Sequence, residues 1–164
     1  MRRTNYEKRI PEILSGTVAA FLLAFSAGIP SAVAVGPGSW MDQVTGAPSL
    51  YRTQQWYDSA KLKPWTNDLV GKITNIKVRA TITNPPTVGQ GLAAGLCPVG
   101  YSEYYCADIT QFVYGASVNG TITDFAGYPP ATSFYFKWGV MDSKNQPIFP
   151  VTVISKQSIE VSYE

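Results

Sequence analysis

The sequence contains no histidine and only two cysteines among its 164 residues. Without histidine, the chain lacks the usual general base of a Ser-His-Asp or Cys-His catalytic arrangement and the commonest transition-metal ligand. The two cysteines do not have the Cys-x-x-Cys spacing of a zinc site, and no Gly-x-Ser-x-Gly nucleophile motif occurs. We therefore expect no metal, no cofactor and no triad-type enzyme.

Charge is also sparse, since only 15% of the residues are Asp, Glu, Lys or Arg. The first 34 residues hold four of the thirteen basic and two of the eleven acidic side chains, which leaves nine of each in the remaining chain. A neutral chain without clustered Lys and Arg does not have the electrostatic pattern of a nucleic-acid-binding protein. Nucleic acid is therefore excluded as an expected partner.

The N-terminus has the layout of a secretory signal peptide. Basic residues precede a stretch without charge from Ile13 to Met41, and its apolar part, Thr17–Phe25, is followed by Ala32 and Ala34 in the A-x-A arrangement of a signal-peptidase site. We expect cleavage near Ala34 and export to the periplasm, the cell surface or the medium.

The alternative for this stretch is a membrane anchor, because a helix of about 20 apolar residues spans a bilayer. Gly28, Pro30 and the run Gly36-Pro37-Gly38 interrupt the apolar stretch too early for a full span. The sequence therefore favours three parts: a signal peptide over 1–34, an irregular aromatic-rich segment over 35–67, and a β-sandwich domain over 68–164.

The two cysteines, Cys97 and Cys106, both lie in the exported part of the chain. An even pair of cysteines in an exported protein indicates a disulfide. Closing a loop of about ten residues stabilises the fold by about 2–3 kcal/mol in the chain-entropy model. We expect this bond to restrain a loop between two strands.

Alternation of apolar and polar residues predicts several short strands from residue 68 onward, with no helix-type period in the mature chain. Asn119-Gly120 separates two such runs and predicts a β-hairpin turn, because both positions of a type I′ turn need positive φ. Asn119 also begins an Asn-Gly-Thr sequon, which leaves glycosylation open. The predicted fold is an all-β, antiparallel, immunoglobulin-like (pilin-type) sandwich. The alternating apolar positions are Ile76, Val78, Ala80, Ile82; Phe112, Tyr114, Ala116, Val118; Phe134, Phe136, Trp138, Val140; Val151, Val153; and Ile159, Val161, Tyr163.

Exposed aromatic residues are the main candidates for binding. Tyr101, Tyr104 and Tyr105 lie in the cysteine loop, where a constrained backbone presents rigid contact area at low entropic cost, and Trp56 belongs to the aromatic segment upstream. Paired carboxylates at about 5–10 Å could in principle hydrolyse a glycoside. The candidate carboxylates lie mostly beside turns, where solvated side chains are the ordinary interpretation, and we expect the protein not to be an enzyme. They are Asp58, Asp68, Glu103, Asp108, Asp124 and Asp142.

The C-terminal run, residues 158–164, resembles the last strand of subunits of chaperone-usher fimbriae, which end in alternating apolar residues with an aromatic at the penultimate position. The resemblance implies assembly by strand donation, with a periplasmic chaperone and neighbouring subunits as partners. It also implies that Ile159, Val161 and Tyr163 lie on the strand that faces them. The chain departs from that family in its short cysteine loop and in Val151, where these subunits usually carry glycine.

These patterns predict an exported structural or adhesive subunit of a bacterial surface fimbria. The alternative is a free-standing secreted module that binds carbohydrate or protein through its exposed aromatics, and a host glycan or protein is a possible ligand of either. A small hydrolase that works through two carboxylates is a more distant third hypothesis.

Overall fold

A computed structural model describes residues 37–46, 48–86 and 91–164. The predicted signal peptide and its cleavage site lie outside the described residues. The described part contains no helix that is long and apolar enough to cross a membrane.

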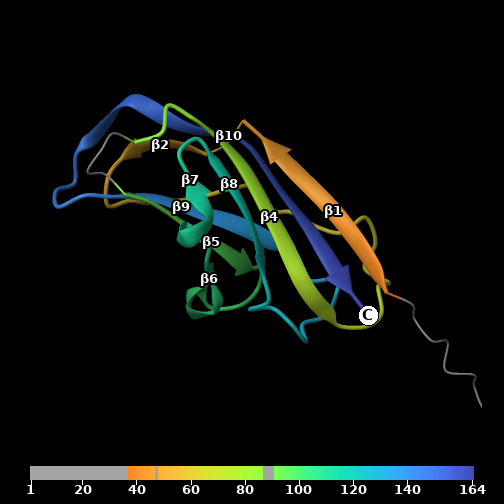
Figure 1. The fold of residues 1–164 in the computed structure, drawn as a ribbon. Coiled ribbons are helices and arrows are strands. Elements are labelled where there is room, and N and C mark those ends of the chain that lie inside the picture. Colours follow the sequence, from red (N-terminus) through yellow and green to blue (C-terminus); the bar gives the residue numbers. More distant parts are fainter. Residues whose placement is uncertain (1–36, 47, 87–90) are drawn as a thin grey trace, which may run out of the picture. The chain divides into compact units, whose positions relative to one another are not determined.

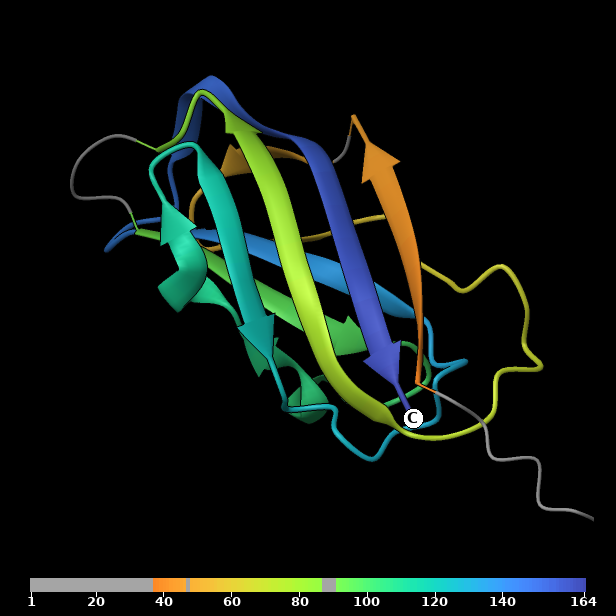
Figure 2. The same cartoon turned by 45° about the vertical axis from the view of Figure 1, so that its right-hand side comes forward.

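The strands form two antiparallel sheets that pack as a sandwich, which confirms the predicted fold class (Figure 1). The six-stranded sheet has the order β1-β10-β4-β8-β7, with β2 pairing to β10, and the four-stranded sheet has the order β3-β9-β5-β6. Figure 2 shows the two sheets as separate layers, with β1, β10, β4 and β8 side by side in one of them. The strands are β1 (Gly38–Thr45), β2 (Ser49–Arg52), β3 (Trp56–Asp58), β4 (Ile73–Thr83), β5 (Gly91–Pro98), β6 (Ala107–Asp108), β7 (Val113–Tyr114), β8 (Ser117–Ile122), β9 (Phe134–Met141) and β10 (Pro147–Tyr163); two short 3₁₀ helices are η1 (Glu103–Tyr105) and η2 (Thr110–Phe112).

The alternating residues of β4 and β9 face the space between the sheets, as their pattern predicts. Every second residue of β4 from Ile76 to Ile82 is buried, and the same holds for β9 from Phe134 to Val140. Side chains of successive strand residues point to opposite faces, so the polar residues between them cover the outer faces. The core is therefore built from the inner faces of both sheets.

The polar residues 155–158, which separate the last two apolar runs of the sequence, lie at a β-bulge inside one long strand. The pairing of β10 with β4 shifts register between Ile154 and Lys156, and this changes which residues point inward. Ile154 and Gln157 are both buried, although three positions separate them. Gln157 accepts a hydrogen bond of 2.6 Å from Nε1–H of Trp138, which explains a fully buried polar side chain in the core.

The prediction of a hairpin turn at Asn119-Gly120 is wrong. Both residues lie inside β8, where Gly120 is the partner of Val78 on β4. A side chain at Gly120 would overlap the ring of Phe112, so this glycine permits a close approach and makes no turn. The turn lies earlier, at Gly115, whose φ of 59° fits the first central position of a two-residue II′ hairpin between β7 and β8.

The segment over 35–67, predicted to be irregular, contributes three strands to the sandwich. β1 pairs with β10, β2 with β10, and β3 with β9. Trp40 on β1 is buried in the core, where its Nε1–H donates a hydrogen bond of 2.7 Å to the carbonyl oxygen of Pro130. Because this segment is rich in Gly and Pro, its sequence does not show the alternation that predicts strands. In addition, each strand pairs with a strand that lies far along the chain, so the local sequence does not reveal the pairing.

Candidate binding cleft

One row of cross-strand partners runs over the outer face of the four-stranded sheet. Asp58 on β3 pairs with Lys137 on β9, Lys137 pairs with Gly95 on β5, and Gly95 pairs with Asp108 on β6. These residues alternate with core-facing neighbours and therefore point outward. Three charged side chains and one glycine thus share a line across four strands.

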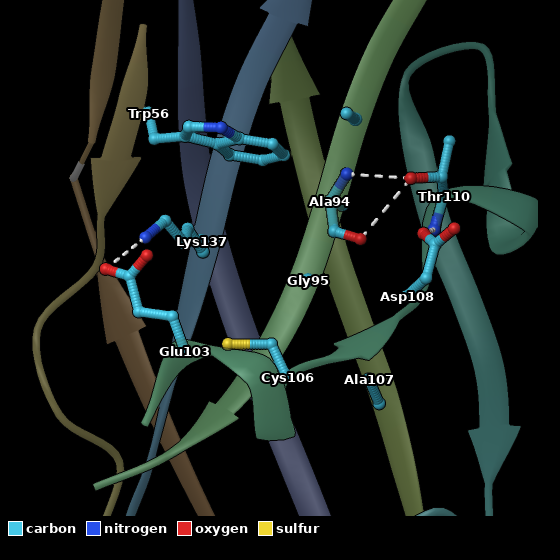
Figure 3. A pocket seen from close by; sticks show the side chains of 10 residues that line it. Trp56, Ala94, Gly95, Glu103, Cys106, Ala107, Asp108, Thr110 and Lys137 are labelled. Atoms are coloured by element: carbon cyan, nitrogen blue, oxygen red, sulfur yellow. Dashed lines mark hydrogen bonds and ion pairs between the residues drawn. The ribbon is translucent and has the colours of Figure 1, made fainter. Parts of the chain in front are cut away.

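This row crosses an open cleft of about 340 Å³, drawn in Figure 3. Its floor is made of small residues on β5, which leave the hollow unfilled. Trp56 and Lys137 lie on one side of β5 and Asp108 and Thr110 on the other (Figure 3). The lining residues are Trp56, Ala93, Ala94, Gly95, Glu103, Cys106, Ala107, Asp108, Thr110 and Lys137.

Trp56 borders the cleft as a fixed but accessible aromatic ring. It is the cross-strand partner of Gly139, and a Cβ placed on Gly139 would lie 3.0 Å from Cε3 of the indole. The ring therefore packs directly on the glycine backbone, while 47% of the residue stays exposed. In Figure 3 it extends from β3 across β9 toward β5. Such a ring offers apolar contact area to a ligand with little entropic cost, because it is already positioned.

Among the described residues that line the cleft, Lys137 is the one cation, and it is held by an ion pair. Its Nζ lies 2.6 Å from Oε1 of Glu103, and the Lys137 side chain is only 14% exposed. Burial by itself would lower the pKa of Lys137, but the hydrogen bond and the charge of Glu103, with smaller contributions from Asp58 and Tyr135, raise it above its ordinary value. The ammonium group is therefore charged at neutral pH and already has one carboxylate partner.

Tyr135 lies on β9, two positions before Lys137. Partial burial and the charge of Asp58 raise the pKa of Tyr135, and the charge of Lys137 opposes this shift. Its hydroxyl is therefore a neutral hydrogen-bonding group at physiological pH.

The opposite side of the cleft is ordered by a short hydrogen-bond chain. The N–H of Thr110 donates to Oδ1 of Asp108 over 2.8 Å, and the N–H of Ala94 donates to Oγ1 of Thr110 over 3.0 Å. The Thr110 hydroxyl thus accepts the hydrogen bond from Ala94 that the backbone of a neighbouring strand would otherwise accept. These contacts hold the Asp108 carboxylate beside the floor of the cleft.

The disulfide between Cys97 and Cys106 is confirmed, with an S–S distance of 2.03 Å. Cys97 belongs to β5 and Cys106 directly follows η1. The bond therefore fixes η1, and with it Glu103, against the strand that forms the floor of the cleft. The sequence predicted a restrained loop; the structure shows that this loop places the partner of Lys137.

The aromatic residues expected to bind ligand do not gather at one site. Trp56 lines the cleft, whereas the three loop tyrosines do not. Tyr101 packs against Tyr128 with ring centroids 5.3 Å apart and against Tyr105 at 6.0 Å, and Tyr104 is 98% exposed. The tyrosines form a separate exposed surface on the disulfide loop.

The C-terminal strand lies inside the six-stranded sheet. β10 pairs with β1 from Gly38 opposite Tyr163 to Thr45 opposite Lys156, and it pairs with β4 on its other side. Ile159 and Val161 are buried in the core, and Tyr163 is partly buried and packs against it. In the described structure β1 occupies the edge of β10 at which the resemblance places a donated strand.

Sequence reasoning missed most of the cleft. Of the candidate carboxylates, the structure brings Asp58, Glu103 and Asp108 to one face, with Glu103 and Asp108 lining the cleft; Asp68, Asp124 and Asp142 do not line it. Lys137 alternates with the apolar residues of β9, which predicts an outward position and no more, and no sequence pattern distinguishes Gly95. No group of acidic and cysteine residues in the described ranges could hold a metal ion.

Comparison with known proteins shows the fold. No family model matches the sequence, and no curated protein matches it. Among solved structures, the crystal structure of FlhE is similar, with a TM-score of 0.63 and 23% sequence identity over 79% of this chain and 98% of that one. At this identity the similarity establishes a shared fold and carries no activity to this chain.

Proposed function

We propose that this protein is an exported binding module without enzymatic activity, and that its ligand occupies the cleft on the outer face of the four-stranded sheet. The observation that carries the proposal is the combination of an accessible, pre-positioned Trp56 with a hollow of small residues and a few ordered polar groups. Ligand sites are typically concave, apolar in part and equipped with a small number of fixed polar groups. The disulfide supports export, because such bonds persist in oxidising compartments.

The test is a ligand-binding experiment on the mature chain, isolated with the N-terminus that export leaves. Mass spectrometry of the exported protein should place that N-terminus near Val35. Mixtures of small sugars, peptides and polyamines are then added while amide and indole N–H signals are followed by NMR. We expect shifts that cluster on the cleft, including the Trp56 indole. Shifts confined to the loop tyrosines, or no shifts at all, would contradict a role for the cleft.

A second candidate is the fimbrial subunit, and the position of β1 favours it. β1 is a strand of eight residues at the edge of its sheet, and Trp40 is its only buried residue. An edge strand with a single fully buried side chain is suited to transfer into a neighbouring copy, as in assembly by strand donation. A periplasmic chaperone and neighbouring subunits are the partners that this proposal requires.

A designed disulfide distinguishes the two arrangements of β1. Gln43 on β1 and Ser158 on β10 are direct cross-strand partners, and such pairs lie within the distance that a disulfide spans. In the double variant Gln43→Cys with Ser158→Cys, a strand paired within its own chain gives a cross-linked monomer. Strand donation instead gives covalent dimers and longer ladders on non-reducing gels. Monomers alone at every protein concentration would reject this second candidate.

A further inference from the structure

We propose that the cleft binds one ring of a neutral or amino-substituted sugar and rejects acidic sugars. This inference rests on the proposed binding function and names the chemical class of its ligand. It is carried by the charges of the cross-strand row, by the shape of the cleft and by the pairing of the strand that forms its floor.

The local charge argues against an anionic ligand. Lys137 is the one cation of the row, and it is already paired with Glu103 at 2.6 Å. Asp58 precedes Lys137 in the row and Asp108 ends it, so with Glu103 three carboxylates and one ammonium group lie on this face of the sheet. A carboxylate or sulfate on the ligand would meet a net negative field, whereas a hydroxyl or an ammonium group would not.

The shape of the cleft fits a flat ring with polar edges. Trp56 supplies an aromatic surface for the apolar C–H face of a pyranose, and the floor at Gly95 has no side chain that would obstruct it. Carboxylate oxygens accept hydrogen bonds from ligand hydroxyls, and the remaining N–H groups of Lys137 donate to ligand oxygens. Donors and acceptors therefore lie around the edge of an apolar contact, which is the pattern that a sugar ring requires.

The backbone at the floor argues against an extended peptide. β5 pairs with β9 along its whole length, and on its other side Ala94 bonds to Thr110 while Gly95 and Leu96 pair with β6. A peptide that adds a strand needs unpaired backbone groups along an edge. The floor of the cleft does not offer such an edge, so side-chain contacts must supply the recognition.

The experiment uses tetrasaccharides of equal length as probes for the mature chain. Cellotetraose is neutral, the glucosamine tetramer is cationic and the galacturonate tetramer is anionic, and binding is measured by calorimetry with NMR mapping. We expect the neutral and the amino tetramers to bind. The Kd of the galacturonate tetramer should be at least about tenfold higher. Equal or tighter binding of galacturonate would overturn the proposal.

Two variants with matched controls show whether the sugar lies in the cleft. At Gly95 a Cβ would lie 3.5 Å from the nearest atom, the carbonyl oxygen of Ala107, so Gly95→Ala fits the fold and adds a methyl group to the floor of the cleft. Gly91→Ala, on the same strand but outside the cleft, is its control. Trp56→Ala should weaken binding about tenfold or more, whereas Trp65→Ala, at a residue that is 81% exposed and outside the cleft, should leave it unchanged.

The outcomes separate the ligand class from the function. If Gly95→Ala and Trp56→Ala weaken peptide or polyamine binding but no sugar binds, the sugar assignment fails and the binding function remains. If sugar binds but only Tyr104→Ala removes it, the site is the disulfide loop and the cleft proposal is overturned. If no probe of any class binds, both proposals fail.

Discussion

Replacing Trp40 by alanine tests whether one residue anchors the edge strand β1. Trp40 is 3% exposed, and its indole donates a hydrogen bond to Pro130. Burial of about 200 Å² of aromatic surface at about 25 cal/mol per Å² gives an upper value of about 5 kcal/mol. Truncations of buried Phe and Trp cost about 3–5 kcal/mol, and we expect Trp40→Ala to fall in this range.

The assay is equilibrium unfolding of the mature chain in guanidinium chloride, with a thermal melt in parallel. For a domain of this size the expected loss corresponds to a fall in Tm of about 10–20 °C. If β1 detaches before the rest of the sandwich unfolds, the m-value also falls, because less surface is exposed in the main transition. Hydrogen exchange of the β1 amides then reports the local opening directly.

The matched control is Met41→Ala on the neighbouring residue, which is 63% exposed and on the opposite face of β1. Its free energy of unfolding should stay within about 0.5 kcal/mol of the parent value. A loss below about 1 kcal/mol for Trp40→Ala would refute the reasoning, since β1 would then be held by backbone pairing and not by its buried tryptophan.

Two further predictions concern packing and pH. Gly120→Ala should destabilise the protein by about 1–3 kcal/mol, because the new methyl group overlaps the Phe112 ring. In the background of Phe112→Ala most of this penalty should disappear, and the control Gly91→Ala should have no such effect. If chemical denaturation shows that the losses of Gly120→Ala and Phe112→Ala are additive, the proposed contact is contradicted. Glu103→Gln should lower stability at pH 8. The pKa of Lys137 is raised in the folded state, so the stability that the ion pair contributes is complete below the ordinary pKa of 10.5. This contribution is lost as pH rises through the folded-state pKa, and the melting temperatures of the parent and the variant should therefore converge at high pH. A difference in melting temperature that persists above the folded-state pKa of Lys137 would show that Glu103 acts by packing. Replacing the lysine, in Lys137→Met, should remove the pH dependence of this difference.

Local patterns predicted several elements correctly. Alternation identified β4 and β9, since each strand has one face in the core, and an even pair of cysteines after a predicted signal peptide predicted the disulfide. Such features depend on neighbouring residues or on the compartment, and they can be read along the chain.

The errors arose where pairing with a distant strand decides the local conformation. Asn119-Gly120 has the composition of a turn, but β8 continues through it because β4 pairs alongside and the ring of Phe112 needs the space above Gly120. The polar residues 155–158 interrupt the apolar alternation, and pairing with β4 carries the strand through them: a bulge restores the inward phase, and Gln157 accepts a hydrogen bond from Trp138.

The sequence by itself determined the strand faces, the disulfide and the low charge of residues 35–164, because these follow from composition and from a period of two. Only the tertiary structure decided the cleft, whose row joins Asp58, Lys137, Gly95 and Asp108 from four strands. A one-residue change in register would turn these side chains to the other face of the sheet. Which residues meet is therefore set by strand order and register, and these depend on the packing of the whole sandwich.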